Sequence, residues 1–299
     1  MCLDFWLFHL VQPLCHPDQK LALLQLKNSL SINESSSEEW CNPSASYSKT
    51  SLWAKQNNTE DCCSWDGVTC DIVSGNVIGL NLSCSWLQGE FHPNNTLFLL
   101  SHLQKLYLDG NDFKESWIPS EFGKLVELTH LNLSYSRFSG QVSPHITQLP
   151  KLVSLILSCA ANNELSFEPT TWEGLVRNLT YITKLRVGGV DLSSIQPSSL
   201  LRNISSSLRS LSLYENGLHG NLENYNFFSL PNLLVLNLYG YKDLKGSLPK
   251  SNLSCTSLQS LVIADTSLSG ELTHFIDQLK SLEYLFLPNN KFDIFLQSK

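Results

Sequence analysis

A leucine pattern, L-x-x-L-x-L with an occasional Val or Ile, recurs nine times between Val77 and Leu287. Successive copies start 26, 25, 24, 30, 26, 25, 25 and 24 residues apart. Leucine supplies 56 of the 299 residues, whereas there is a single Met. Ordinary globular domains spread their apolar content over several residue types. The chain is therefore predicted to be built from repeats, not from the two compact domains that its length alone suggests.

Each copy of the pattern predicts one short strand. In L-x-L the leucines point to one side of the strand and the x residues to the other. One copy cannot bury its own apolar face, so the copies must stack with their strands in parallel. The period lies in the range of leucine-rich repeats. We therefore predict a leucine-rich-repeat solenoid of the α/β type, a curved horseshoe of parallel strands, over residues 76–299 with the last of about nine repeats incomplete.

Polar residues follow the predicted strands at a fixed distance. Asn111, Asn216 and Asn290 occupy a position from which a side-chain amide can satisfy backbone groups in the bend. Ser85, Ser136 and Thr266 are expected to replace it more weakly. A glycine in the sequence L-x-G follows in several repeats, where it permits a turn with positive φ.

Residues 15–75 are predicted to form an amino-terminal cap for the solenoid, after a short apolar segment at 1–14 that resembles a partial or degenerate signal sequence. Residues 18–30 place leucines with helical spacing behind Pro17, with Asp18 as the expected capping residue. A polar stretch from 33 to 58 is interpreted as a surface insertion in this cap.

The cap holds most of the nine cysteines. Neither the paired spacing nor the His partners of a zinc site occur, so disulfides are predicted and no metal or other cofactor. Spacing alone does not fix the connectivity. The preferred pairs are Cys63 with Cys70 and Cys62 with Cys15, and a pair between Cys41 and Cys84 is left open. Cys159 and Cys255 are expected to be buried thiols.

Eight N-x-S/T sequons and the predicted disulfides indicate passage through the secretory pathway. The candidate glycosylation sites are Asn33, Asn57, Asn81, Asn94, Asn132, Asn178, Asn203 and Asn252. A repeat that favours Asn-Leu-Ser also creates sequons by its own consensus. The net charge of -7 argues against a nucleic acid or an anionic membrane surface as the main partner.

Both ends of the sequence look cut. The apolar amino terminus lacks a basic start, and the chain stops inside the ninth repeat without a closing cap or an apolar stretch long enough to span a membrane. We therefore expect a fragment or truncated product of a longer chain, attached to a membrane only through a carboxyl-terminal helix absent from this sequence.

Catalysis is not expected. The sequence contains no nucleophile-elbow, zinc-protease or phosphate-loop motif, and its eight His are scattered singly. Exposed strands of a solenoid also offer no deep, water-excluded cleft.

Binding is predicted on the concave face, where side chains stand in columns on a rigid ladder. Tyr and Arg commonly anchor interfaces, although outward Tyr on a strand is also simply a good strand former. The candidate ligand-binding residues are Tyr107, Asp109, Tyr135, Arg186, Tyr214, Glu215, Asn237, Tyr239 and Phe286.

From Cys15 onwards the chain resembles the plant leucine-rich-repeat receptor-like proteins, most closely the group that confers resistance to leaf mould. Residues 15–27, 61–71, 74–89, 128–134 and 178–180 carry the resemblance, and the run Cys-Cys-Ser-Trp-Asp-Gly-Val-Thr-Cys at 62–70 is its most specific part. The resemblance implies a sensor on the extracellular face of the plasma membrane that binds a peptide, protein or glycan ligand and signals in defence through partner receptor kinases.

Two other functions compete with this one. The chain could be a soluble leucine-rich-repeat inhibitor of a microbial wall-degrading enzyme, or a truncated decoy or pseudogene product; a complete chain would then be secreted to the apoplast. The inhibitor would need a carboxyl-terminal cysteine cap, which this sequence does not show.

Overall fold

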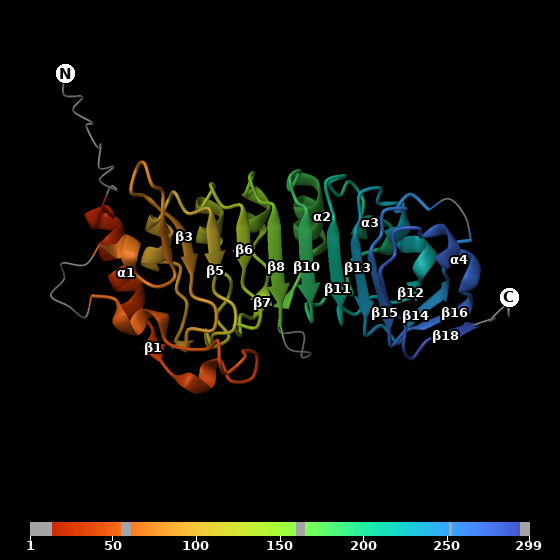
Figure 1. Ribbon diagram of the computed structural model, residues 1–299, viewed down its shortest axis with the longest axis horizontal. Helices are drawn as coiled ribbons and strands as arrows, with labels where there is room; N and C mark the ends of the chain where they lie inside the picture. The colour runs from red at the N-terminus through yellow and green to blue at the C-terminus, as the bar shows by residue number, and fades with distance from the viewer. Residues whose placement is uncertain (1–13, 55–60, 160–164, 251–252, 294–299) are drawn as a thin grey trace, which may run out of the picture.

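The computed structural model describes residues 14–54, 61–159, 165–250 and 253–293. They form a solenoid whose main sheet runs along the long axis of the molecule (Figure 1). Nine strands of this sheet are parallel, and β2 (Val68–Cys70) adds to its end in antiparallel orientation. The parallel strands are β3 (Val77–Asn81), β5 (Lys105–Tyr107), β6 (His130–Asn132), β8 (Ser154–Ser158), β10 (Lys184–Gly188), β11 (Ser210–Tyr214), β13 (Val235–Tyr239), β15 (Ser260–Ala264) and β17 (Tyr284–Phe286).

Leucine alternation sets the register of this sheet. Leu131 pairs with Leu155 on the next strand, and Leu155 with Leu185 after that. None of these three side chains has any exposed surface. The residues between them point outward, as the period of two requires. The predicted solenoid of parallel strands is confirmed, with one strand for each copy of the leucine pattern.

A second, narrower sheet was not predicted from the sequence. It forms where the L-x-G segments of neighbouring repeats pair in parallel, and Gly220, Gly246 and Gly270 there adopt the positive φ that favours glycine. Its strands are β12 (Gly220–Asn221), β14 (Leu244–Ser247), β16 (Ser267–Glu271) and β18 (Lys291–Asp293). Two shorter pairings are β7 (Gly140–Gln141) with β9 (Leu165–Ser166), and β1 (Ser31–Ile32) with β4 (Leu87–Gln88).

Short helical turns connect the strands on the convex side. Three phenylalanine rings pack there and fill the space behind the leucines. The ring centroid of Phe91 lies 5.1 Å from that of Phe113 and 6.0 Å from that of Phe122. The α-helices are α2 (Pro169–Asn178), α3 (Pro197–Leu200) and α4 (Thr273–Gln278). The 3-10 turns are η1 (Glu34–Ser36), η2 (Lys49–Leu52), η3 (Cys62–Ser64), η4 (Thr96–Leu99), η5 (Ser120–Lys124), η6 (Pro144–Gln148), η7 (Leu222–Tyr225) and η8 (Phe227–Ser229).

The predicted asparagines satisfy the bends after the strands. The buried Asn111 amide donates to the carbonyls of Leu82 and Leu108, each at 2.8 Å, and its oxygen accepts from the backbone N–H groups of Ser85 and Leu87. Asn216 and Asn290 donate to repeat carbonyls in the same way. These side chains therefore bridge neighbouring repeats where the ladder of backbone hydrogen bonds turns a corner.

Helix α1 (Pro17–Ser29) closes the amino-terminal end of the core with Ala22, Leu23 and Leu26. The expected helix is confirmed, but the predicted capping role of Asp18 is wrong. Pro17 already occupies the first helical position, for which its fixed φ is suited, so Asp18 lies in the first turn. Among the described helices, none has the length and apolarity needed to cross a bilayer.

Three disulfides fasten the cap. Cys15 pairs with Cys62, Cys63 with Cys70, and Cys41 with Cys84, with Cα–Cα distances of 5.5, 5.4 and 5.9 Å. The first two are the preferred pairs and the third is the one left open. Sulfur atoms from Cys15, Cys63 and Cys70 lie within 4.8 Å of one another, and because all three are bonded, none remains as a thiolate ligand. Cys159 and Cys255 are buried, as expected, and burial raises the pKa of the Cys255 thiol to about 11.

Residues 31–53 cover most of the polar stretch interpreted as a surface insertion between 33 and 58, and many of them are exposed; residues 55–58 lie outside the described part. The segment runs past the ends of the first strands (Figure 1), and we call it the cap extension. The Oγ of Ser37 donates to the carbonyl of Gly110 at 2.6 Å, and the disulfide of Cys41 ties the segment to the first repeat. The insertion is therefore fixed because it supplies a covalent and a polar contact to the repeats.

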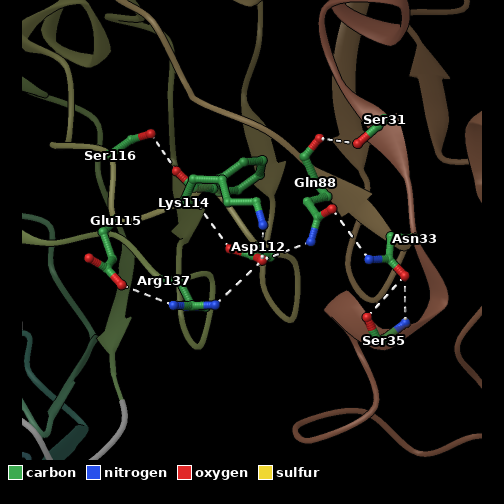
Figure 2. A network of polar contacts seen from close by, with 10 residues as sticks. Ser31, Asn33, Ser35, Gln88, Asp112, Lys114, Glu115, Ser116 and Arg137 are labelled. Atoms are coloured by element: carbon green, nitrogen blue, oxygen red, sulfur yellow. Dashed lines mark hydrogen bonds and ion pairs between the residues drawn. The ribbon is translucent and has the colours of Figure 1, made fainter.

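A polar network joins the cap extension to the third repeat (Figure 2). Asn33 donates to Gln88, Gln88 donates to Asp112, and Arg137 approaches Asp112 at 3.5 Å and Glu115 at 2.9 Å. Burial alone would raise the pKa of Asp112. Hydrogen bonds from Lys114 and Gln88, together with the positive charge of Arg137, outweigh burial and lower this pKa. The carboxylate is thus held ionised at the centre of the network.

Candidate functional site

The outward residues of the main sheet stand in three columns, because each strand is in register with the next. The central column passes through Tyr107 on β5, Arg186 on β10 and Asn237 on β13. Its members, in order, are Asn81, Tyr107, Asn132, Ile156, Arg186, Ser212, Asn237, Val262 and Phe286.

Three predicted residues meet near the middle of this face. The hydroxyl of Tyr135 lies 2.6 Å from that of Tyr214, and the guanidinium of Arg186 lies 5.4 Å from the centre of the Tyr214 ring. Tyr214 lies flat over Gly188 on the neighbouring strand, where an added Cβ would come within 1.9 Å of the ring. Glycine at 188 therefore makes room for the tyrosine.

Trp40 completes this group from the cap extension. Its ring stacks on Tyr135 with centroids 4.6 Å apart and planes 13° from parallel. We call Trp40, Tyr135, Arg186 and Tyr214 the aromatic cluster. Burial, and then the hydrogen bond with Tyr214, raise the pKa of Tyr135 above its ordinary value, so the Tyr135 hydroxyl stays protonated. The cluster offers ring faces, one guanidinium and two hydroxyls to a ligand.

Acidic residues line the ends of the strands. Asp109 accepts a hydrogen bond from Ser83 at 2.6 Å, and burial raises its pKa. The negative charge of Asp265 is the largest cause of a raised pKa at Tyr239, and burial and the charge of Glu215 raise this pKa further. We call Asp109, Glu215 and Asp265 the acidic row. Tyr239 stands beside Tyr214 in the register, so the predicted Tyr214, Glu215 and Tyr239 lie together.

Other predicted binding residues lie apart from the aromatic cluster. Tyr107 and Asp109 are on and just after β5, three strands from β10 in the sheet order, and Phe286 is exposed on β17 at the far end. The Oδ1 atom of Asn237 is buried without a hydrogen-bond partner among the described residues. One compact site cannot include all nine predicted residues; a ligand extended along the sheet could reach them in turn.

Six of the eight sequons fall in the described part; Asn57 and Asn252 lie outside it. Asn94, Asn178 and Asn203 are exposed away from the main sheet. Asn81 and Asn132 stand in the central column, and Asn33 belongs to the network of Figure 2. Whether any of them carries a glycan stays a prediction.

The sequence interpretation missed Trp40, Gly188 and a set of outward basic residues, Lys105, His130 and Lys184. Trp40 lies in a polar stretch, and only the pairing of the adjacent Cys41 with Cys84 could have brought it to the repeats. The basic residues precede the middle leucine of their repeats, so reading that column down the alignment would have found them.

Sequence and structure comparisons agree with the repeat architecture. The family described as "Leucine rich repeat N-terminal domain" matches residues 16–71, and "Leucine Rich Repeat" matches 102–125 and 127–149. Receptor-like protein 6 of Arabidopsis thaliana is 42% identical over 286 residues, which is 93% of this chain and 28% of the relative. Receptor-like protein Cf-9 of Solanum pimpinellifolium is 38% identical over 276 residues, 90% of this chain and 31% of the relative. The chain thus spans about three tenths of the length of these relatives.

Two solved structures show the same fold. A plant ice-binding protein superposes with a TM-score of 0.62 at 24% identity, covering 94% of this chain and 81% of that one. The Arabidopsis receptor kinase HAESA, in complex with the peptide hormone IDA and the co-receptor SERK1, gives a TM-score of 0.51 at 23% identity, covering 93% and 54%.

Proposed function

Because the chain belongs to the leucine-rich-repeat receptor-like proteins of plants, we propose that it is a non-catalytic extracellular recognition module which binds a peptide along its concave sheet. The solenoid supplies a rigid ladder of outward side chains, and an extended chain crossing the strands can contact one column position in each repeat.

The aromatic cluster is the observation that carries this proposal. Trp40 of the cap extension stacks on Tyr135, which bonds to Tyr214, and Tyr214 lies against Arg186. The cluster therefore presents Arg and Tyr, the residue types that commonly anchor interfaces. A stacked, hydrogen-bonded group of this kind is already ordered before a ligand arrives, which reduces the entropy lost on binding.

Partners and location belong to the same proposal. The HAESA ectodomain shares this fold and is described in complex with a peptide hormone and a co-receptor, and two relatives are receptor-like proteins. We infer that this chain acts at the extracellular face of the plasma membrane, that its ligand is a peptide used in defence signalling, and that a receptor kinase is its signalling partner.

The test is a selection of extended peptides that bind the secreted chain, followed by calorimetry on variants. Arg186→Ala and Tyr214→Phe should each weaken the selected peptides by about tenfold, the usual loss for one anchoring contact. Glu173→Ala, exposed on helix α2, is the matched control and should leave affinity unchanged. Equal affinity of all three variants for every selected peptide would refute binding at the aromatic cluster.

A further inference from the structure

A column of basic side chains runs along the strand starts of the concave sheet. Lys105 on β5 pairs in register with His130 on β6, and Lys184 on β10 stands two strands further on, beyond Ser154 on β8. Both lysines are exposed, and the His is half-buried. We call Lys105, His130 and Lys184 the basic column. Arg186 lies two residues along β10 and also points outward.

The three groups are close enough to act on one another. Burial lowers the pKa of His130, and the positive charges of Lys105 and Lys184 lower it further. The charges of Lys105 and Lys184 therefore act on the His130 imidazole from opposite sides, and keeping these groups together is electrostatically unfavourable.

Lys105 and Lys184 take part in none of the ion pairs found between described residues, whereas Arg186 lies over the ring of Tyr214. The acidic row lies at the other ends of the strands; Asp109 follows Lys105 by four residues, roughly 13 Å in an extended chain. In a protein with a net charge of -7, a patch of unpaired cations points to an anionic partner.

Space is available beside the column. A cavity of about 250 Å³ at the amino-terminal end of the column is lined by Thr69, Lys105 and Tyr107 among others. Ser154, between His130 and Lys184, is short, buried and uncharged, so it adds no opposing charge to the column.

The spacing fits an extended peptide. Strands in a sheet are about 4.8 Å apart, so Lys105 and Lys184, three strand steps apart, are separated by roughly 14 Å at their backbones. In an extended peptide, residues i, i+2 and i+4 share one face, and i and i+4 lie about 13 Å apart. Carboxylates at every second residue would therefore meet Lys105, His130 and Lys184 in turn.

We propose that the basic column binds an acidic segment of a peptide ligand, extended across strands β5 to β10 with carboxylates on alternate residues. This rests on the proposed function in that the ligand is a peptide. Asp109, which follows β5, and Tyr135, which follows β6, lie at the other ends of these strands, so the peptide presents basic or hydroxyl groups on its other face. A uniformly anionic polysaccharide fits this two-sided face less well, because Asp109 would repel it.

The probe is the fluorescent octapeptide (Glu-Thr)4, with (Gln-Thr)4 as its uncharged match, and anisotropy measures binding to the secreted chain. We expect (Glu-Thr)4 to bind about tenfold more tightly than (Gln-Thr)4, with the difference shrinking as salt rises. Lys105→Ala and Lys184→Ala should each weaken (Glu-Thr)4 several-fold, whereas Lys280→Ala, an exposed lysine beyond helix α4, should not.

Charge reversal sharpens the test. The double variant Lys105→Glu with Lys184→Glu should lose (Glu-Thr)4 and gain (Lys-Thr)4, a result that misfolding cannot produce. If Lys105→Ala, Lys184→Ala and Lys280→Ala changed the affinity for (Glu-Thr)4 equally, the proposal that the basic column binds an acidic segment would be overturned.

Two further outcomes separate the proposals. Column-dependent binding of an oligogalacturonate in place of (Glu-Thr)4 would overturn the peptide assignment. Selected peptides that depend on Arg186 and Tyr214 but not on Lys105 or Lys184 would overturn the basic column and leave the proposed function standing.

Discussion

The cap and the repeats are held together by different means. Between Cys15 and Cys84 the chain uses three disulfides and the stacked rings of Trp53 and Trp65, 5.3 Å apart. The nine parallel strands rely on buried leucines, backbone ladders and buried asparagines. An inner repeat has a neighbour on each side, whereas the cap has one neighbour only, and the disulfides of the cap make up for the missing contacts.

The cap extension belongs to both regions. It is tied covalently to the first repeat, yet its Trp40 stacks on Tyr135 of the third. The part of the chain held by disulfides therefore overlaps the part held by packing, and the overlap extends over the first three repeats.

The largest effect should come from breaking a repeat at its core. Leu131→Asp would place a carboxylate at a fully buried position with no partner, and we expect a loss of more than about 4 kcal/mol in unfolding free energy. Secreted yield measures it. Ser260→Asp, on an outward position of β15, is the control and should be secreted normally. Normal yield for Leu131→Asp would contradict the register of the sheet.

The disulfides should differ from one another. Replacing Cys41 and Cys84 by Ser opens a loop with a sequence separation of 43, whereas Cys63 and Cys70 are separated by 7. Chain entropy predicts losses of roughly 4 and roughly 2 kcal/mol respectively. Thermal unfolding of the two double-Ser variants measures the difference, and the opposite order would show that native contacts outweigh loop entropy in this cap.

Asn111→Ala tests the polar link between repeats. The amide serves three carbonyls and two N–H groups in a buried bend, so its loss should cost about 1–3 kcal/mol. Denaturant unfolding measures it, with exposed Asn232→Ala as the control. A neutral result for Asn111→Ala would mean that water replaces the amide.

The smallest expected effect is a lowered pKa at His130. His130 should titrate below its ordinary value of about 6.5, because burial and two lysine charges disfavour its cationic form. A pKa depressed in the folded state means that stability is present above about 6.5 and declines as the pH falls through the folded pKa. NMR of the imidazole protons measures the midpoint; Lys105→Ala should raise it and Lys280→Ala should not. No response to Lys105→Ala would place the two residues out of electrostatic reach.

Repeat architecture and disulfides could be predicted because each depends on spacing along the chain. Leu131, Leu155 and Leu185 recur at fixed intervals, and the register follows from alternation alone. The second sheet could not be predicted in this way, because its strands are two to five residues long and pair only after the main sheet has set the distance between repeats.

The sequence identified individual candidate site residues but did not show which of them lie together in the fold. Tyr135 and Tyr214 were both recognised, yet they are 79 residues apart in sequence and meet because Gly188 lets the Tyr214 ring cross a neighbouring strand. Trp40 joins them only through a segment whose path depends on the Cys41–Cys84 link. Contacts of this kind depend on the curvature of the solenoid, which the period does not encode.

The bond between Tyr135 and Tyr214 constrains how such a gene can change. Tandem repeats are readily gained and lost by unequal exchange, and most parts of a solenoid tolerate the change because each unit contacts only its neighbours. Between β6 and β11 one unit more or less would move the two hydroxyls apart or together by about 4.8 Å, far more than the 2.6 Å bond allows. We therefore expect the number of repeats from the third to the sixth to be fixed, while copy number can vary on the carboxyl-terminal side of this stretch.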